Sequence, residues 1–153
     1  HYLESKYADG RVLIENDASG WYESGTVRDV TIRNNQFIEC GYNSGSNNYV
    51  ININPQTHRL IPGYYVHSHI RIENNIFKVY DYPLLSARST NGLIFKGNTI
   101  IPSNLFKPGV KRAAFNLTAC KNVSIEKNVF TNNEKPVINL VSMNSKDVKT
   151  DIK

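Results

Sequence analysis

The sequence is poor in cysteine, with only Cys40 and Cys120 among its 153 residues. Neither belongs to a Cys-x-x-Cys pair or to a Cys/His cluster with the spacing of a metal site. Each follows a different predicted strand, far apart in the chain, so a disulfide between them is not expected. We therefore predict two unpaired thiols, buried or half-buried, and neither a metal nor a cofactor.

Charge and long apolar runs are also scarce. Charged residues make up 20% of the chain, and the net charge of +5 is dispersed, with three cations in the densest group, 107–112. Nucleic-acid binding requires a basic stripe with stacking aromatics, and a membrane span requires roughly 18 apolar residues. We expect neither nucleic acid nor membrane as a partner. The start at His1, without a leader pattern, indicates a fragment of a longer protein.

What the sequence does contain is a repeat of alternating apolar residues, then Asn, then an apolar residue two places later. Asn tolerates the left-handed backbone of a sharp corner, and stacked Asn side chains can form an amide ladder above an apolar stack. A second alternating segment precedes each copy, at 11–17, 49–56, 83–89 and 113–119; another lies at 136–142, before a weaker copy at 147–153. The four clear copies are Asn35/Phe37, Asn75/Phe77, Asn98/Ile100 and Asn128/Phe130.

Short strands that recur with corners between them favour coils stacked along one axis, each strand pairing in parallel with its equivalent in the next coil. We predict an all-β fold, a right-handed parallel β-helix of about five coils, forming one domain over 1–153. An antiparallel sandwich remains the alternative, although it does not explain the Asn-x-apolar register. An uncapped end of such a stack offers a route to homo-association.

Two insertions, 18–26 and 57–67, separate the first and second strands of the first two coils. Long loops on one side of a solenoid often build binding surfaces. The first carries Trp21 and Tyr22, and the second Tyr64 and Tyr65. Aromatic faces suit sugar rings, but loop tyrosines serve plain packing about as often.

Outward-facing polar residues form columns when the first strands are aligned on Ile14, Ile51, Leu85, Phe115 and Ile138. With neighbouring coils ~4.8 Å apart, one polar line suits a glycan, although exposed positions are commonly polar for no further reason. The column one residue later reads Glu15, Asn52, Ser86, Asn116 and Asn139. The column three residues later reads Asp17, Asn54, Arg88, Thr118 and Val141, with Gln56 one outward step beyond Asn54.

Glycoside cleavage usually needs two carboxyl groups. Asp17, Glu15 and Glu23 are the candidates near this face, and each could instead be an ordinary surface acid. Only one Asp stands in the column, so the row of Asp that holds calcium in a polysaccharide lyase is poorly supported.

The chain resembles the C-terminal part of the catalytic β-helix of bacterial α-1,3-galactosidases. The resemblance rests on VLIENDASGWYESGTVRDVTIRNNQFIECGYN (12–43), ININPQ (51–56) and HIRIENNIFKVYDYPLLSARSTNGLIFKGNTI (69–100), with WYESG…VRDVTIRNN the most specific part. It implies an inverting exo-enzyme that removes terminal α-1,3-galactose from blood-group-B-type glycans without a metal, in a secreted, periplasmic or cell-surface location. Combined with the polar columns and the two insertions, it leads us to predict catalytic Asp17 and Glu23, and substrate-binding Trp21, Asn54, Gln56, Tyr65 and Arg88.

Two departures from the family pattern affect this expectation. The family has an acidic pair where this chain has Asn16 and Asp17, and Pro-Glu where it has Pro55 and Gln56. Amides cannot act as general acid or base, so we expect this chain to be inactive by itself. A non-catalytic glycan-binding or scaffold β-helix remains an alternative. A lyase or epimerase of acidic polysaccharide is a further one, favoured by the positive charge.

Overall fold

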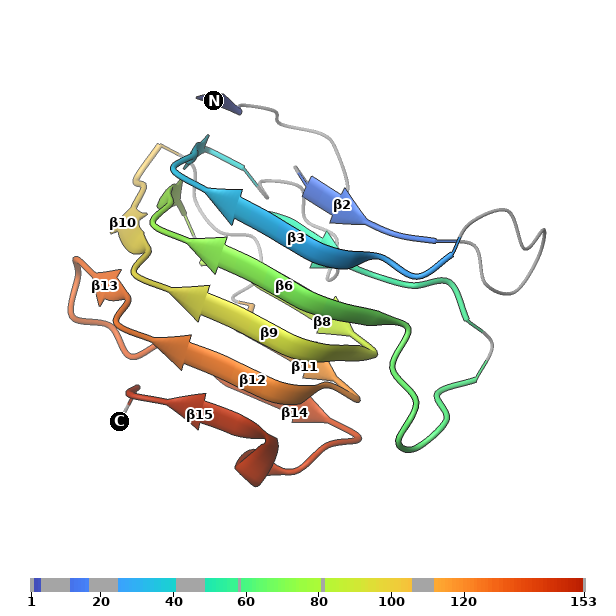
Figure 1. Cartoon of the computed structure of the whole chain (residues 1–153). Helices are drawn as coiled ribbons and strands as arrows, with labels where there is room; N and C mark the ends of the chain where they lie inside the picture. Colours follow the sequence, from blue (N-terminus) through green and yellow to red (C-terminus); the bar gives the residue numbers. More distant parts are fainter. Residues whose placement is uncertain are drawn as a thin grey trace.

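The computed structural model describes residues 2–3, 12–16, 25–40, 49–57, 59–80, 82–105 and 112–152. Within these ranges the chain is all-β, and its strands form three parallel sheets of five strands each (Figure 1). The one helical element in them is the 3-10 turn Ser145–Asp147. No helix in the described part could cross a membrane. The predicted all-β class and the parallel pairing are confirmed.

The chain visits the three sheets in a fixed order and then begins the next unit. In Figure 1 the strands of sheet II descend in front, with those of sheet I behind them. Sheet I contains β2 (Val12–Ile14), β5 (Ile51–Ile53), β8 (Leu85–Arg88), β11 (Phe115–Thr118) and β14 (Ile138–Val141). Sheet II contains β3 (Arg28–Arg33), β6 (His67–Glu73), β9 (Thr90–Lys96), β12 (Lys121–Glu126) and β15 (Val148–Thr150).

Sheet III follows the Asn corners, and its strands were not among the segments predicted from the sequence. Its strands are two to four residues long. They are β1 (Tyr2–Leu3), β4 (Gln36–Ile38), β7 (Ile76–Val79), β10 (Thr99–Pro102) and β13 (Val129–Phe130).

The core lies between the sheets and is built by alternation, since every second side chain of a strand points inward. Phe37, Phe77, Phe95 and Phe115 are fully buried. The rings of Phe37 and Phe77 are stacked at 4.9 Å, and Phe95 meets Phe115 edge-on at 5.0 Å. Cys40 and Cys120 are also buried and form no disulfide with each other, as predicted.

The predicted asparagine ladder is present at the corners between sheets II and III. The main-chain N and the side-chain Nδ2 of Asn75 both donate to Oδ1 of Asn98, at 2.9 and 3.1 Å. The same pair of bonds joins Asn35 to Asn75 and Asn98 to Asn128. Each rung therefore satisfies buried donors of the rung before it, and the ladder links four successive units.

The left-handed residue of these corners is not the ladder asparagine, which corrects the expectation from sequence. It is the residue before it: Asn34, Asn74, Gly97 and Lys127, with φ between 55° and 67°. The left-handed residue turns the chain, and this leaves the next residue free to point its amide along the ladder.

Candidate functional site

The outward face of sheet I carries the polar columns, but the register of β2 differs from the one inferred from sequence. Val12, not Ile14, pairs with Ile51, and Ile14 pairs with Ile53. Asn54 N donates to the carbonyl of Ile14 at 2.9 Å. The outward position beside Asn54 therefore belongs to Glu15 and not to Asp17, and the predicted line Asp17–Asn54–Arg88 is wrong at its first member.

Three side chains of the corrected column come from neighbouring strands. Ile53 pairs with Ala87, so Asn54 and Arg88, each one residue later, are in register. Arg88 also pairs with Thr118. Glu15, Asn54 and Arg88 thus follow one another at the strand spacing of ~4.8 Å, and all three are half-buried.

Gln56 joins this column through a side-chain hydrogen bond, because its Nε2 donates to Oε1 of Glu15. Its main-chain N donates to the carbonyl of Asn16 at 3.0 Å. The amide therefore holds the Glu15 carboxylate in place. The Arg88 guanidinium makes no hydrogen bond or ion pair to any residue in the described ranges, so it is available to sugar hydroxyls or to an anion.

The second insertion leaves sheet I beside this column and returns at the start of β6. A turn closes it, in which Tyr64 N donates to the Ile61 carbonyl at 3.0 Å and Gly63 has a φ of 82°. Val66 N then donates to Oγ of the buried Ser89 at 3.1 Å. Since Tyr65 and Arg88 each adjoin one partner of this bond, their main chains lie close together.

Tyr65 lines a cavity of about 210 Å³ between the insertion and the corners of later units. Tyr64 and Ile61 line it from the insertion, and Cys120 and Met143 from the corners. Burial raises the pKa of the Cys120 thiol to about 11, so the thiol in this wall is protonated at neutral pH. The volume is below the ~300 Å³ at which ligand pockets usually begin, and the cavity offers an edge for a ligand rather than an enclosure.

Three of the predicted residues, Asp17, Trp21 and Glu23, lie outside the described residues. Their neighbour Asn16 is buried, and its Oδ1 has no hydrogen-bond partner in the described part. No group of three or more His, Cys, Asp or Glu side chains in the described ranges could hold a metal ion.

The structure brings Asn54 and Arg88 into one column and places Gln56 beside Glu15. Tyr65 lies in the wall of a neighbouring cavity, and the Val66–Ser89 bond joins its segment to the end of the strand that carries Arg88. The Glu15–Gln56 contact was not foreseen, although both side chains were candidates. The contact depends on the register of β2, which differs by two residues from the one inferred from sequence.

Comparison with known proteins gives a consistent family name. No protein-family model matches the chain. Over 145 residues, 93% of the chain, it is 46% identical to alpha-1,3-galactosidase A of Bacteroides fragilis, matching 24% of that protein. It is 43% identical over 123 residues to alpha-1,3-galactosidase B of Bacteroides thetaiotaomicron, and 40% over 119 residues to that of Akkermansia muciniphila.

The matches cover 76% of the chain in the two B-type proteins, and 20% and 15% of those proteins' lengths. The chain is therefore similar to enzymes named as glycosidases over most of its own length. It spans about a quarter of the length of the curated relatives it matches first.

Proposed function

We propose that the three sheets are the walls of a right-handed parallel β-helix of about five coils. We propose further that it forms the C-terminal part of the catalytic domain of an inverting exo-α-1,3-galactosidase, acting on terminal α-galactose of glycans. The observation that carries this proposal is the 46% identity to a protein of that name across 93% of the chain. The order of the sheets and the asparagine ladder support the fold.

We place the polar groups that the reaction needs on the outward face of sheet I. Inverting hydrolysis uses one carboxylic acid to protonate the leaving oxygen and one carboxylate to activate water, ~6.5–9.5 Å apart. We assign these tasks to Asp17 and Glu23. Asn54, Gln56 and Arg88 would hold sugar hydroxyls, while Trp21 and Tyr65 would bound the galactose ring.

The corrected register adds Glu15 to this assignment. Its carboxylate stands beside Asn54 and accepts from Gln56. In this position it can bind a galactose hydroxyl or orient one of the catalytic acids. We regard Glu15 as a positioning residue.

A non-catalytic glycan-binding protein is the second candidate, and one observation favours it. Gln56 is an amide that donates its hydrogen bond to Glu15, where the resemblance implies a carboxyl group. An amide binds a sugar hydroxyl but cannot transfer a proton. A site built this way would retain galactose without cleaving it.

The deciding experiment uses a chimera in which this chain replaces the matching segment of the B. fragilis galactosidase, with an α-1,3-linked galactose disaccharide as substrate. We expect galactose release that falls at least about 100-fold with Asp17→Asn, as for loss of a general acid or base. Gln56→Glu should raise the release. Asp151→Asn is the matched control, since that carboxylate bonds the main chain of Lys127.

Two results would contradict the enzyme proposal. Release that is unchanged by Asp17→Asn would show that the carboxylate is wrongly assigned. The chimera could also bind the disaccharide and release no galactose, even with Gln56→Glu. This result would support the non-catalytic glycan-binding protein.

A further inference from the structure

A second hollow lies on the outer face of sheet II, away from the sheet I columns. It is a groove of about 560 Å³ that crosses β3, β6, β9 and β12, within the ~300–1,000 Å³ of usual ligand sites. Its polar side chains come in pairs from β3, β6 and β12, while β9 contributes Gly92 and Ile94. The polar residues are Asp29, Thr31, His69, Arg71, Asn122 and Ser124. The groove therefore offers donors and acceptors from successive units along its length.

The groove follows a column of left-handed residues. Asp29, His69, Gly92 and Asn122 have φ of 57°, 54°, 78° and 52°, and the register of the four strands skips all of them. For a residue other than glycine this conformation costs about 1–2 kcal/mol. The same conformation turns the chain at the corners of the fold, for example at Asn34 and Lys127. Here each such residue lies outside the strand register, so the four positions stack and shape the groove.

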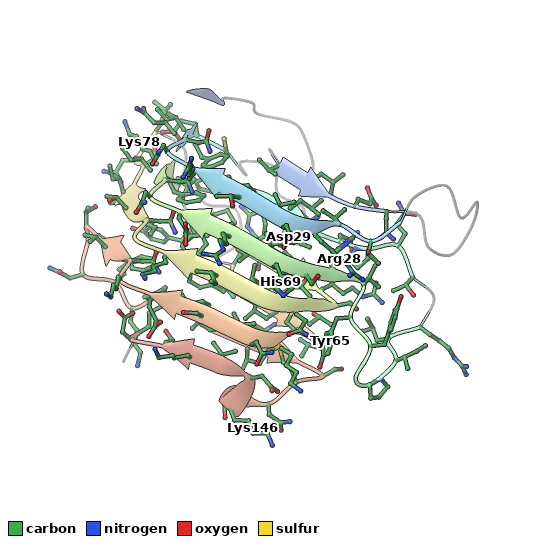
Figure 2. All side chains as sticks on the ribbon, in the orientation of Figure 1. Arg28, Asp29, Tyr65, His69, Lys78 and Lys146 are labelled. Atoms are coloured by element: carbon green, nitrogen blue, oxygen red, sulfur yellow. The ribbon has the colours of Figure 1, made fainter. Side chains whose placement is uncertain are left out.

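The His69 imidazole is held across the groove. Its Nδ1 lies 3.4 Å from Oδ1 of Asp29 on the neighbouring strand, and Figure 2 shows the two side chains together on the near face. Its Cδ2 would lie 3.1 Å from a Cβ at Gly92, so the glycine leaves room for the ring over β9. The imidazole and the Ile94 side chain form an apolar surface among polar groups, which is the lining that a sugar ring requires.

The charge on this face favours an anion. The strands of sheet II carry six basic and three acidic side chains. Two of the acids are already engaged, Asp29 with His69 and Glu126 with Lys149 at 2.9 Å. The Arg71 side chain in the groove is exposed and makes no hydrogen bond or ion pair within the described part of the chain. A guanidinium binds sulfate or carboxylate through two parallel hydrogen bonds.

We propose that this groove binds a saccharide residue that carries an anionic group, a sulfate ester or a carboxylate, with Arg71 holding that group. The ring lies on His69 and Ile94, and Asn122 and Ser124 receive its hydroxyls. The class of ligand rests on the proposed glycan-related function, but the site is separate from the one proposed to cleave galactose. Such a groove would bind the protein to acidic glycans, while the sheet I face acts on another part of the same glycan.

The test is a calorimetric titration of the protein at low ionic strength. The ligands, each titrated separately, are galactose 6-sulfate, galacturonic acid, galactose and inorganic sulfate. We compare the unchanged chain with Arg71→Gln and with Arg33→Gln. Arg33 is an exposed arginine of β3 that does not line the groove, so both variants remove one charge from the same sheet. We expect one acidic sugar to bind at least tenfold more tightly than galactose. Arg71→Gln should abolish that preference, and Arg33→Gln should change affinity less than twofold.

The two acidic sugars identify which anionic group the groove takes. Equal weakening by the two variants would show diffuse attraction to a basic sheet and overturn the proposal. Equal binding of inorganic sulfate and galactose 6-sulfate, or no binding of either acidic sugar, would also overturn it. Disaccharide hydrolysis by the chimera should be the same with and without Arg71→Gln. Hydrolysis therefore tests the galactosidase proposal, and binding of the acidic sugars tests the groove proposal independently.

Discussion

Removal of one ladder asparagine should destabilise the protein far more than removal of an asparagine on its surface. The Asn98 side chain is fully buried and makes four hydrogen bonds: two accepted from Asn75, one donated to the Ile72 carbonyl and one donated to Asn128. At about 1 kcal/mol for each hydrogen bond, Asn98→Ala should cost about 4 kcal/mol. That is a large share of the 5–15 kcal/mol typical of a whole domain.

Two further Asn→Ala substitutions make the prediction quantitative. Asn116 accepts one hydrogen bond from Asn139 at 2.8 Å on the exposed face of sheet I, and its loss should cost no more than about 0.5 kcal/mol. Asn35 is a terminal rung in a half-exposed position, and its loss should cost about 1–2 kcal/mol.

The assay is urea denaturation followed by circular dichroism. With a slope of about 2 kcal/mol/M, Asn98→Ala should lower the midpoint by about 2 M and Asn116→Ala by a few tenths. A midpoint for Asn98→Ala equal to that for Asn116→Ala would refute the reasoning that the ladder carries stability.

Two titratable groups give further predictions. His67 is fully buried, its Nδ1 accepts from Val27 N at 3.1 Å, and burial lowers its pKa from 6.5. Below about pH 6.5 the unfolded chain therefore binds a proton that the folded chain does not bind. The free energy of unfolding should decrease as the pH is lowered through this range, and His67 should not change it above this range. Urea midpoints at pH 7.5 and 5.5 should show a smaller pH effect for His67→Asn than for His69→Asn; equal effects would contradict the assignment. The buried Cys120 thiol, with its pKa near 11, should react with a thiol reagent at pH 8 at least about 100-fold more slowly in the folded than in the unfolded chain, measured in Cys40→Ser; comparable rates would contradict it.

The strand pattern of this protein could be predicted because it is local. An Asn such as Asn98 and an apolar residue two places after an Asn, such as Phe77, occur at the same place in each unit. Inward positions such as Ile51 and Leu85 alternate with polar ones. Sheet III was not predicted because its strands, such as Ile76–Val79, directly follow the Asn corners. The apolar residue two places after each Asn was therefore assigned to the corner and not to a strand.

The amino-acid pattern is sufficient to tell which residues of the predicted strands face the core, since alternation marks one face of a strand. Only the tertiary structure decided the register of β2. A shift of one residue reverses the two faces of a strand and is excluded by pattern. A shift of two, from Ile14 to Val12, keeps the same face of the strand toward the core and leaves Leu13 on the outer face. The hydrogen bonds between strands made that choice, and with it they placed Glu15 beside Asn54. The groove on sheet II was decided in the same way, because it exists only where four left-handed residues from separate units are stacked together.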